Sequence, residues 1–240
     1  MNESFYHILF LSACTFQLVF MLLQWVLFRR PDYLYYILYV FACGLFIALR
    51  VNNVIQILPF TLNPSWNEIT DHPLIVFAIW MYIRFGYHFL NLKQLQPKVY
   101  IAAKRLEYGF AGYFFIKFLL LPLNLSYYYA SLIYLVVVLI LVTLAGFVII
   151  RLLKQKNLLN NFLVSGSLCI TIGGGVGPVL ALFLPNMGEG SLLIYYPFEI
   201  ALLIEFFLLT TGFALKNKIL QQQVIKAQQE IIKGYQNRSD

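Results

Sequence analysis

Seven long apolar stretches, separated by breaks that are polar or contain Pro or Asn, set the limits on what this chain can fold into. The hydrocarbon core of a bilayer is about 30 Å thick, so a helix needs about 20 mostly apolar residues to cross it. Because 61 % of the 240 residues are hydrophobic and 11 % are charged, the composition is that of a membrane protein. We place the stretches at residues 5–28, 33–57, 74–90, 107–122, 129–151, 161–184 and 192–215. The sequence therefore predicts an all-α, polytopic membrane protein with a seven-transmembrane helix bundle over residues 1–215.

The last apolar stretch continues into a polar segment, residues 216–240, with no Gly or Pro at the boundary. We expect one helix to run from the membrane into the cytoplasm. In the polar part, residues recur at alternating steps of three and four, which is the a/d seam of a coiled coil. The seam residues are Asn217, Leu220, Val224, Ala227, Ile231 and Gly234. An Asn at an a position favours a parallel homodimer, although so few heptads are also compatible with an unpaired amphipathic helix.

Basic residues are distributed unevenly among the segments between the apolar stretches. The second, fourth and sixth of these segments contain no Lys or Arg. The other segments and the tail contain Arg29, Arg30, Lys93, Lys98, Lys104, Arg105, Arg151, Lys154, Lys156, Lys216, Lys218, Lys226, Lys233 and Arg238. Positive residues are retained on the cytoplasmic side of a membrane. The pattern thus predicts an inner-membrane protein with its N-terminus outside and its C-terminus in the cytoplasm, and it explains the net charge of +7 without nucleic-acid binding.

Five ionisable residues lie well inside the predicted membrane stretches, where each is costly unless it is paired or reaches water. They are Arg50, Arg84, Lys117, Glu199 and Glu205. A helix rises about 1.5 Å per residue, which places Arg50, Lys117 and Glu199 at similar depths in the outer third of the membrane. Arg84 and Glu205 fall near its middle. We therefore expect Glu199 to pair with Arg50 or Lys117, and Glu205 to pair with Arg84.

His88 lies one turn below Arg84 on the same helix face and joins this intramembrane charge network. The network is compatible with three roles. Its pairs could only hold the bundle together, they could form a bistable polar core that links the last helix to the cytoplasmic segment, or they could relay protons or ions. Lys117, near the end of a short stretch, could also extend to the interface without a partner.

A glycine-rich string, SGSLCITIGGGVGP at residues 165–178, lies in the sixth stretch. No strand precedes it and no Lys and Ser/Thr follow it, so it does not match a phosphate-binding loop. Small residues allow membrane helices to approach closely, and a proline weakens a helix locally. We interpret Gly173, Gly174, Gly175, Gly177 and Pro178 as a packing face with a kink, and a hinge that moves in signalling is the alternative.

The segment at residues 59–73 contains one His and two carboxylates, His72, Glu68 and Asp71. These are too few ligands to predict a metal site, so we expect a solvated loop. No HExxH or GxSxG motif and no usefully spaced pair of carboxylates occurs in the sequence, and the last stretch has no central Lys for a retinal Schiff base. We expect no metal, no cofactor and no enzymatic activity of this chain itself.

Three segments carry a more specific signal. They are FRRPDYLYYILYV at the second stretch, YIRFGYHFLNLKQLQPK at the end of the third, and the Glu-bearing last stretch with its polar continuation. Together they resemble a bacterial family, the seven-transmembrane receptors with diverse intracellular signalling modules. In that family an extracellular ligand-binding domain usually precedes the first helix, and a histidine kinase, diguanylate cyclase or DNA-binding module follows the seventh. The 240 residues contain neither, which suggests a piece of a longer protein or a minimal membrane module.

These observations favour a receptor module that relays an extracellular or membrane cue through the seventh helix. Its expected partners are the lipid bilayer, a second copy of the chain through the C-terminal helix, and a cytoplasmic signalling module or effector. The sequence does not identify the ligand. A small-molecule or ion transporter or channel is the alternative. Transporters often contain inverted repeats and discontinuous helices, whereas this sequence has no internal repeat and one stretch interrupted by Gly and Pro.

Overall fold

The computed structural model describes residues 3–55, 64–120, 136, 143, 145–154, 157–183 and 195–239. Within these ranges, side chains are described except at residues 3, 4, 53–55, 64–72, 117, 118, 120, 177–183 and 234–239. The described residues are helical apart from short turns, and no strand occurs among them. The predicted all-α class is therefore confirmed for this part of the chain.

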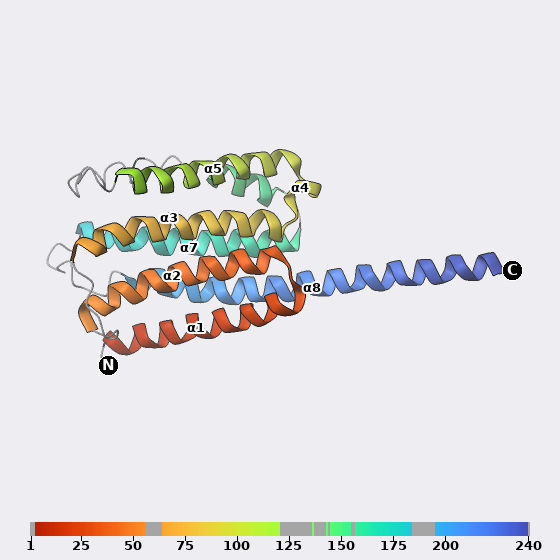
Figure 1. Cartoon of the computed structure of the whole chain (residues 1–240), viewed down its shortest axis with the longest axis horizontal. Coiled ribbons are helices and arrows are strands. Elements are labelled where there is room, and N and C mark those ends of the chain that lie inside the picture. The colour runs from red at the N-terminus through yellow and green to blue at the C-terminus, as the bar shows by residue number, and fades with distance from the viewer. Residues whose placement is uncertain are drawn as a thin grey trace.

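Long helices lie side by side with nearly parallel axes (Figure 1). They are α1 (Glu3–Phe28), α2 (Pro31–Ile55), α3 (Pro64–Phe89), α5 (Pro97–Leu120), α7 (Leu158–Phe183) and α8 (Tyr196–Ser239). The short helix α4 (Leu92–Leu95) connects α3 to α5, and a further helical stretch covers residues 145–153. α8 packs against α7 in its first half and then extends beyond the other helices to the C-terminus (Figure 1). We call residues 218–239 of α8 the rod.

Four of the described helices are long and apolar enough to cross a membrane. The candidate spans are Phe5–Phe28, Pro31–Asn52, Leu158–Val176 and Tyr196–Lys233. α3 contributes a shorter apolar stretch, Pro73–Phe89. The predicted fifth stretch, at residues 129–151, lies largely outside the described residues, so the full number of seven spans stays a prediction.

The surface and the interior have the polarity of a membrane protein. Large apolar side chains are exposed around the bundle, for example Phe16 and Phe207, which are 73 % and 74 % exposed. Among the residues with described side chains, the buried polar and charged ones are His7, Gln17, Asp32, Asn52, Glu107, Asn160, Glu199 and Glu205. Lipid tails can cover the apolar surface, whereas polar groups inside the bundle need partners from other helices.

Two helices are longer than the apolar stretches predicted within them. α3 begins at Pro64, although its apolar part, Pro73–Phe89, agrees with the predicted stretch at residues 74–90. The expectation of a loop over all of residues 59–73 is therefore wrong from Pro64 onward. α5 begins at Pro97, ten residues before the predicted stretch at 107–122. Pro is tolerated in a first helical turn because its missing N–H would have no partner there. Hydropathy did not include the additional turns because those of α3 are mostly polar and those of α5 contain three basic residues. The side chains of Glu68, Asp71 and His72 lie outside the described set, and no metal-binding group of His, Cys, Asp and Glu occurs within it.

α7 lies in close contact with α8 at Gly173. A Cβ atom at Gly173 would meet the Ala201 Cβ at 2.4 Å and the Pro197 carbonyl oxygen at 2.6 Å, so a side chain does not fit there. Gly175, by contrast, has no described atom within 4 Å of such a position. α7 continues as one helix through Pro178. The predicted hinge stays a prediction.

Candidate functional site at the base of the rod

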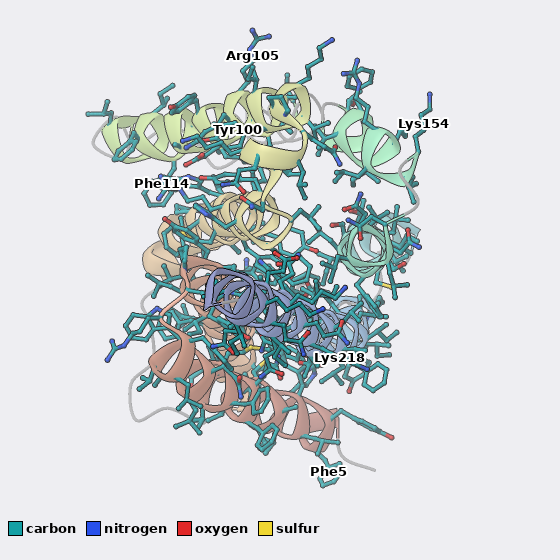
Figure 2. All side chains as sticks on the ribbon, turned by 90° about the vertical axis from the view of Figure 1, so that its right-hand side faces the viewer. Phe5, Tyr100, Arg105, Phe114, Lys154 and Lys218 are labelled. Carbon is teal, nitrogen blue, oxygen red and sulfur yellow. The ribbon has the colours of Figure 1, made fainter. Side chains whose placement is uncertain are left out.

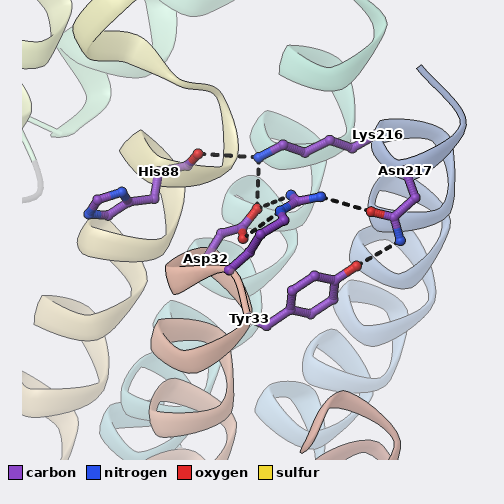
Figure 3. Close-up of polar contacts among 6 residues, drawn as sticks. Asp32, Tyr33, His88, Lys216 and Asn217 are labelled. Atoms are coloured by element: carbon purple, nitrogen blue, oxygen red, sulfur yellow. Dashed lines mark hydrogen bonds and ion pairs between the residues drawn. The ribbon is translucent and has the colours of Figure 1, made fainter. Parts of the chain in front are cut away.

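The turn between α1 and α2 is short and sharp. Arg29 and Arg30 separate the two helices, and Arg29 has a left-handed backbone conformation with φ 52°. The Arg29 N–H donates to the Trp25 carbonyl oxygen at 2.8 Å, which closes the end of α1. Pro31 then opens α2, as is common at a first helical position. This turn places the first residues of α2 beside the base of the rod (Figure 3).

Asp32 lies at the centre of this region. Its carboxylate is buried, at 2 % exposure, and two cations bind it. Arg30 Nε donates to Oδ1 at 3.1 Å and a terminal nitrogen of the same guanidinium donates to Oδ2, so the pair is bidentate. Lys216 Nζ, from α8, donates to Oδ2 at 2.7 Å. One carboxylate thus joins the α1–α2 turn to the last helix.

The Asn217 carboxamide makes a second connection between the same elements. Arg30 Nη1 donates to Asn217 Oδ1 at 2.8 Å. Asn217 Nδ2 in turn donates to the Tyr33 hydroxyl, also at 2.8 Å. The amide that was predicted to begin a coiled-coil seam therefore binds two side chains of its own bundle.

The other predicted seam residues are exposed in this chain. Leu220, Val224 and Ile231 are 38 %, 57 % and 59 % exposed, and Ala227 is also exposed. Their apolar side chains would gain from burial against a second helix. The homodimer nevertheless stays a prediction.

The end of α3 joins this region through its backbone. Lys216 Nζ donates to the His88 carbonyl oxygen at 3.2 Å, and the same ammonium group lies 5.0 Å from the centre of the Phe89 ring. We call the connected residues the latch (Figure 3). The latch consists of Arg30, Asp32, Tyr33, His88, Lys216 and Asn217. It ties α8 to the α1–α2 turn and to α3 where the rod begins.

An aromatic cluster lies next to the latch on the bundle side. The Phe213 ring of α8 stacks on Tyr33, with 4.4 Å between the ring centres. The same ring lies 5.6 Å from Phe85 and 5.1 Å from Phe89 of α3. All four side chains are buried. Because packed interiors resist continuous deformation, a shift of α8 here also displaces α2 and α3.

Glu205 lies deeper in α8 and has a different environment. Its side chain is fully buried, at 0 % exposure, and the Tyr39 hydroxyl donates to Oε2 at 2.9 Å. Oε1 has no hydrogen-bond partner in the described part of the chain. A hydroxyl, rather than a cation, therefore holds this carboxyl group.

The predicted pairing of Arg84 with Glu205 is wrong, because Arg84 binds a carboxylate of α5. Arg84 Nε donates to Glu107 Oε1 at 2.5 Å. Lys104 Nζ and the Tyr87 hydroxyl donate to Glu107 Oε2 at 2.8 Å and 3.0 Å. Glu107 was missed because α5 begins earlier than predicted, so that the carboxylate lies inside a helix facing α3 and not at the edge of a span.

Glu199 also has a different partner from the one predicted. His7 Nδ1 of α1 lies 2.6 Å from Glu199 Oε1, and both side chains are buried. Arg50, one of the two expected partners, lies over the Phe46 ring at 6.0 Å from its centre. The side chain of Lys117, the other expected partner, lies outside the described set.

The helical order and the polarity of this chain agree with a known membrane family. The model of a family described as 7TM diverse intracellular signalling matches residues 3–216. The chain belongs to this family. No curated protein and no solved structure matches it. Membership in the 7TM diverse intracellular signalling family confirms the resemblance found in the sequence, and it makes this chain a membrane domain linked to intracellular signalling.

Proposed function

We propose that this domain is a receptor module that relays a cue from the bundle through α8 to a cytoplasmic partner. The main support for this proposal is that α8 is a single helix from Tyr196 to Ser239. Its first half makes buried polar contacts at Glu199, Glu205 and Lys216, and its second half is the rod. A rearrangement within the bundle therefore reaches the rod through one continuous element.

The latch is suited to act as a two-state element in such a relay. Arg30 and Lys216 share one carboxylate, so losing either contact leaves a largely buried charge with a weaker counter-charge. A cue that favours one arrangement of these contacts shifts the population of α8 positions. Because a helix rises about 1.5 Å per residue, the rod extends about 30 Å from the latch. A small tilt at the latch becomes a larger displacement at the far end.

The proposal includes a bundle of seven helices in the inner membrane, with the N-terminus outside and the rod in the cytoplasm. It also includes a parallel dimer of rods through Leu220, Val224, Ala227 and Ile231. The distribution of basic residues supports the orientation, and the exposed apolar seam supports the dimer. The module is not itself enzymatic and acts on a cytoplasmic signalling module or effector.

Disulfide cross-linking tests the dimer of rods. In a background without Cys14, Cys43 and Cys169, a single cysteine replacing Leu220 or Val224 should cross-link strongly, because both positions lie on the seam. Gln222→Cys, on another face, should cross-link weakly. A flat profile along the rod would indicate an unpaired helix.

Lys216→Gln in the same cysteine series tests the relay. We expect it to change the cross-linking profile of the rod, because it removes the contacts to Asp32 and to the His88 carbonyl. Lys218→Gln is the matched control. Lys218 lies two residues after Lys216 and its side chain is exposed, so this variant removes an equal charge without removing a latch contact (Figure 2). Equal profiles for the two variants would contradict a role of the latch in the relay.

Cysteine accessibility tests the orientation separately. Ser65→Cys should react with a membrane-impermeant thiol reagent in intact cells. Lys218→Cys should react with the same reagent only after the cells are permeabilised. The reverse pattern would place the rod outside the cell.

A proton or ion transporter is the second candidate, because α8 carries two buried carboxyl groups with partners that can exchange protons. These are Glu199 with His7 and Glu205 with Tyr39. The chain reconstituted into liposomes that contain a pH-sensitive dye distinguishes the two candidates. A proton flux that Glu205→Gln abolishes would favour transport over relay.

A further inference from the structure

A cavity of about 340 Å³ lies between α2, α3, α4 and α5, at the end of the bundle where the rod begins. Its walls include three cations and three tyrosines, namely Arg84, Lys93, Lys104, Tyr35, Tyr87 and Tyr100. Tyr100 lies on the side of α5 that faces the bundle (Figure 2). No carboxylate is among the described residues that line the cavity. Positive charge therefore converges on this space.

Arg84 is held in place while its terminal nitrogens stay available. Its Nε donates to Glu107, and its guanidinium lies over the Tyr35 and Trp80 rings, 5.3 Å and 5.5 Å from their centres. The two Nη atoms make no hydrogen bond to any residue that the structure describes. The side chain is 31 % exposed. Two N–H donors in one fixed plane match two oxygens of a single oxyanion.

Lys104 and Lys93 add positive charge around the same space. Lys104 Nζ lies 2.8 Å from Glu107 Oε2 and 5.1 Å from the centre of the Tyr87 ring. Burial lowers the pKa of Lys104, but hydrogen bonds with Glu107 and Tyr87 outweigh this effect, so the pKa is raised and the group stays cationic. Glu107 compensates one of the three cations. Two positive charges therefore remain for a bound anion.

We propose that this cavity binds a phosphate group. A doubly charged anion fits the uncompensated charge better than a single carboxylate does. An arginine fork and lysine ammonium groups are the donors that commonly bind phosphate oxygens, and tyrosine hydroxyls supply neutral donors. The phosphate could come from a soluble ion or from the headgroup of an anionic lipid, and the test below separates these sources.

The cavity and the latch share His88. Its ring stacks on Tyr35 of α2, with 5.2 Å between the ring centres, and lines the cavity. Its backbone carbonyl accepts the hydrogen bond from Lys216. A bound phosphate thus acts on the end of α3 that contacts the base of the rod. Binding itself does not depend on the proposed relay and is measured without it.

Isothermal titration calorimetry of the full chain in phosphate-free detergent tests the site with two probes. The first probe is inorganic phosphate, and the second is dioctanoyl phosphatidic acid, with dioctanoyl phosphatidylcholine as its zwitterionic control. Saturable binding of inorganic phosphate supports a soluble source. Saturable binding of phosphatidic acid without binding of phosphatidylcholine supports a lipid source. No saturable binding of either probe overturns the proposal.

Charge variants then locate the binding. Lys104→Gln and Lys93→Gln should each weaken it about tenfold, because each removes a charge-assisted contact. Arg105→Gln is the matched control: it removes an equal charge next to Lys104, from an exposed side chain that points away from the bundle (Figure 2). Lys93→Gln leaves the Glu107 contacts intact, so it separates lost binding from misfolding. Equal weakening by Arg105→Gln and Lys104→Gln overturns the proposal, because it would indicate diffuse attraction to the surface.

Discussion

Two buried carboxyl groups of this bundle, Asp32 and Glu205, are held in opposite ways. Asp32, at the base of the rod, accepts hydrogen bonds from the cationic side chains of Arg30 and Lys216. Glu205, in the interior, accepts a hydrogen bond from the Tyr39 hydroxyl, and its second oxygen has no partner in the described part of the chain. The two side chains differ little in burial, at 2 % and 0 % exposure.

The difference follows from depth in the bundle. At the end of the bundle, long cationic side chains can bind a carboxylate while their stems cover apolar surface. In the interior a full charge is costly, and a hydroxyl partner satisfies a carboxyl group without bringing a second charge. We therefore expect the base of the rod to be sensitive to the loss of charge, and the interior to be sensitive to the loss of hydrogen bonds.

Asp32→Asn should have the largest effect on stability. The amide has nearly the same shape, but it leaves Arg30 and Lys216 without their counter-charge, and both side chains are largely buried. We expect the free energy of unfolding to fall by about 3 kcal/mol, the lower end for breaking a buried ion pair, because both cations are partly exposed. Unfolding of the purified chain in SDS, followed by circular dichroism, measures this change.

A double variant shows whether the contact to α8 causes that loss. In the Asp32→Asn background, Lys216→Gln should lower the free energy of unfolding by less than it does alone. The Lys216 ammonium has already lost its counter-charge there, and the second change removes this uncompensated charge. Losses that simply add would mean that Asp32 and Lys216 do not interact.

Most long elements of this fold were predictable from the sequence, because the length of an apolar stretch sets the length of a membrane helix. The single helix from the bundle into the rod, predicted from the absence of Gly and Pro at the boundary, is confirmed. The inward face of α1 could also have been found. His7, Phe10, Cys14, Gln17 and Met21 recur at steps of three and four, and all five are buried. This periodicity would have placed His7 inside the bundle, where it binds Glu199.

The polar partners were not predictable, for two physical reasons. Depth along a helix does not show which neighbour a residue faces. Arg84 and Glu205 have matching depths, but Arg84 lies on the side of α3 that faces Glu107 of α5. The latch, moreover, connects residues far apart in the chain, such as Arg30 and Asn217. Asp32 follows a proline in a first helical turn, where an acidic residue is ordinary and needs no distant partner.

Tyr39→Phe should have an intermediate effect in the interior. It removes the hydroxyl that binds Glu205 Oε2 and leaves a second carboxyl oxygen without a hydrogen bond. We expect the free energy of unfolding to fall by about 1 to 2 kcal/mol, measured in the same SDS titration. Tyr108→Phe removes an equal hydroxyl from a side chain that is 67 % exposed and should change stability little. Similar losses in both variants would argue against a specific role of the Tyr39 hydrogen bond.

Glu205→Gln should have the smallest effect, although it makes the same chemical change as Asp32→Asn. Among the described residues no cation contacts Glu205, so the change to an amide leaves no cation without a counter-charge. The amide oxygen can accept the Tyr39 hydrogen bond, and the NH₂ group replaces an oxygen that already has no partner. We expect the free energy of unfolding to change by less than about 1 kcal/mol, because one buried polar group without a partner replaces another. A loss as large as that of Asp32→Asn would mean that a cation binds Glu205 after all, and the contrast between the base of the rod and the interior would then be wrong.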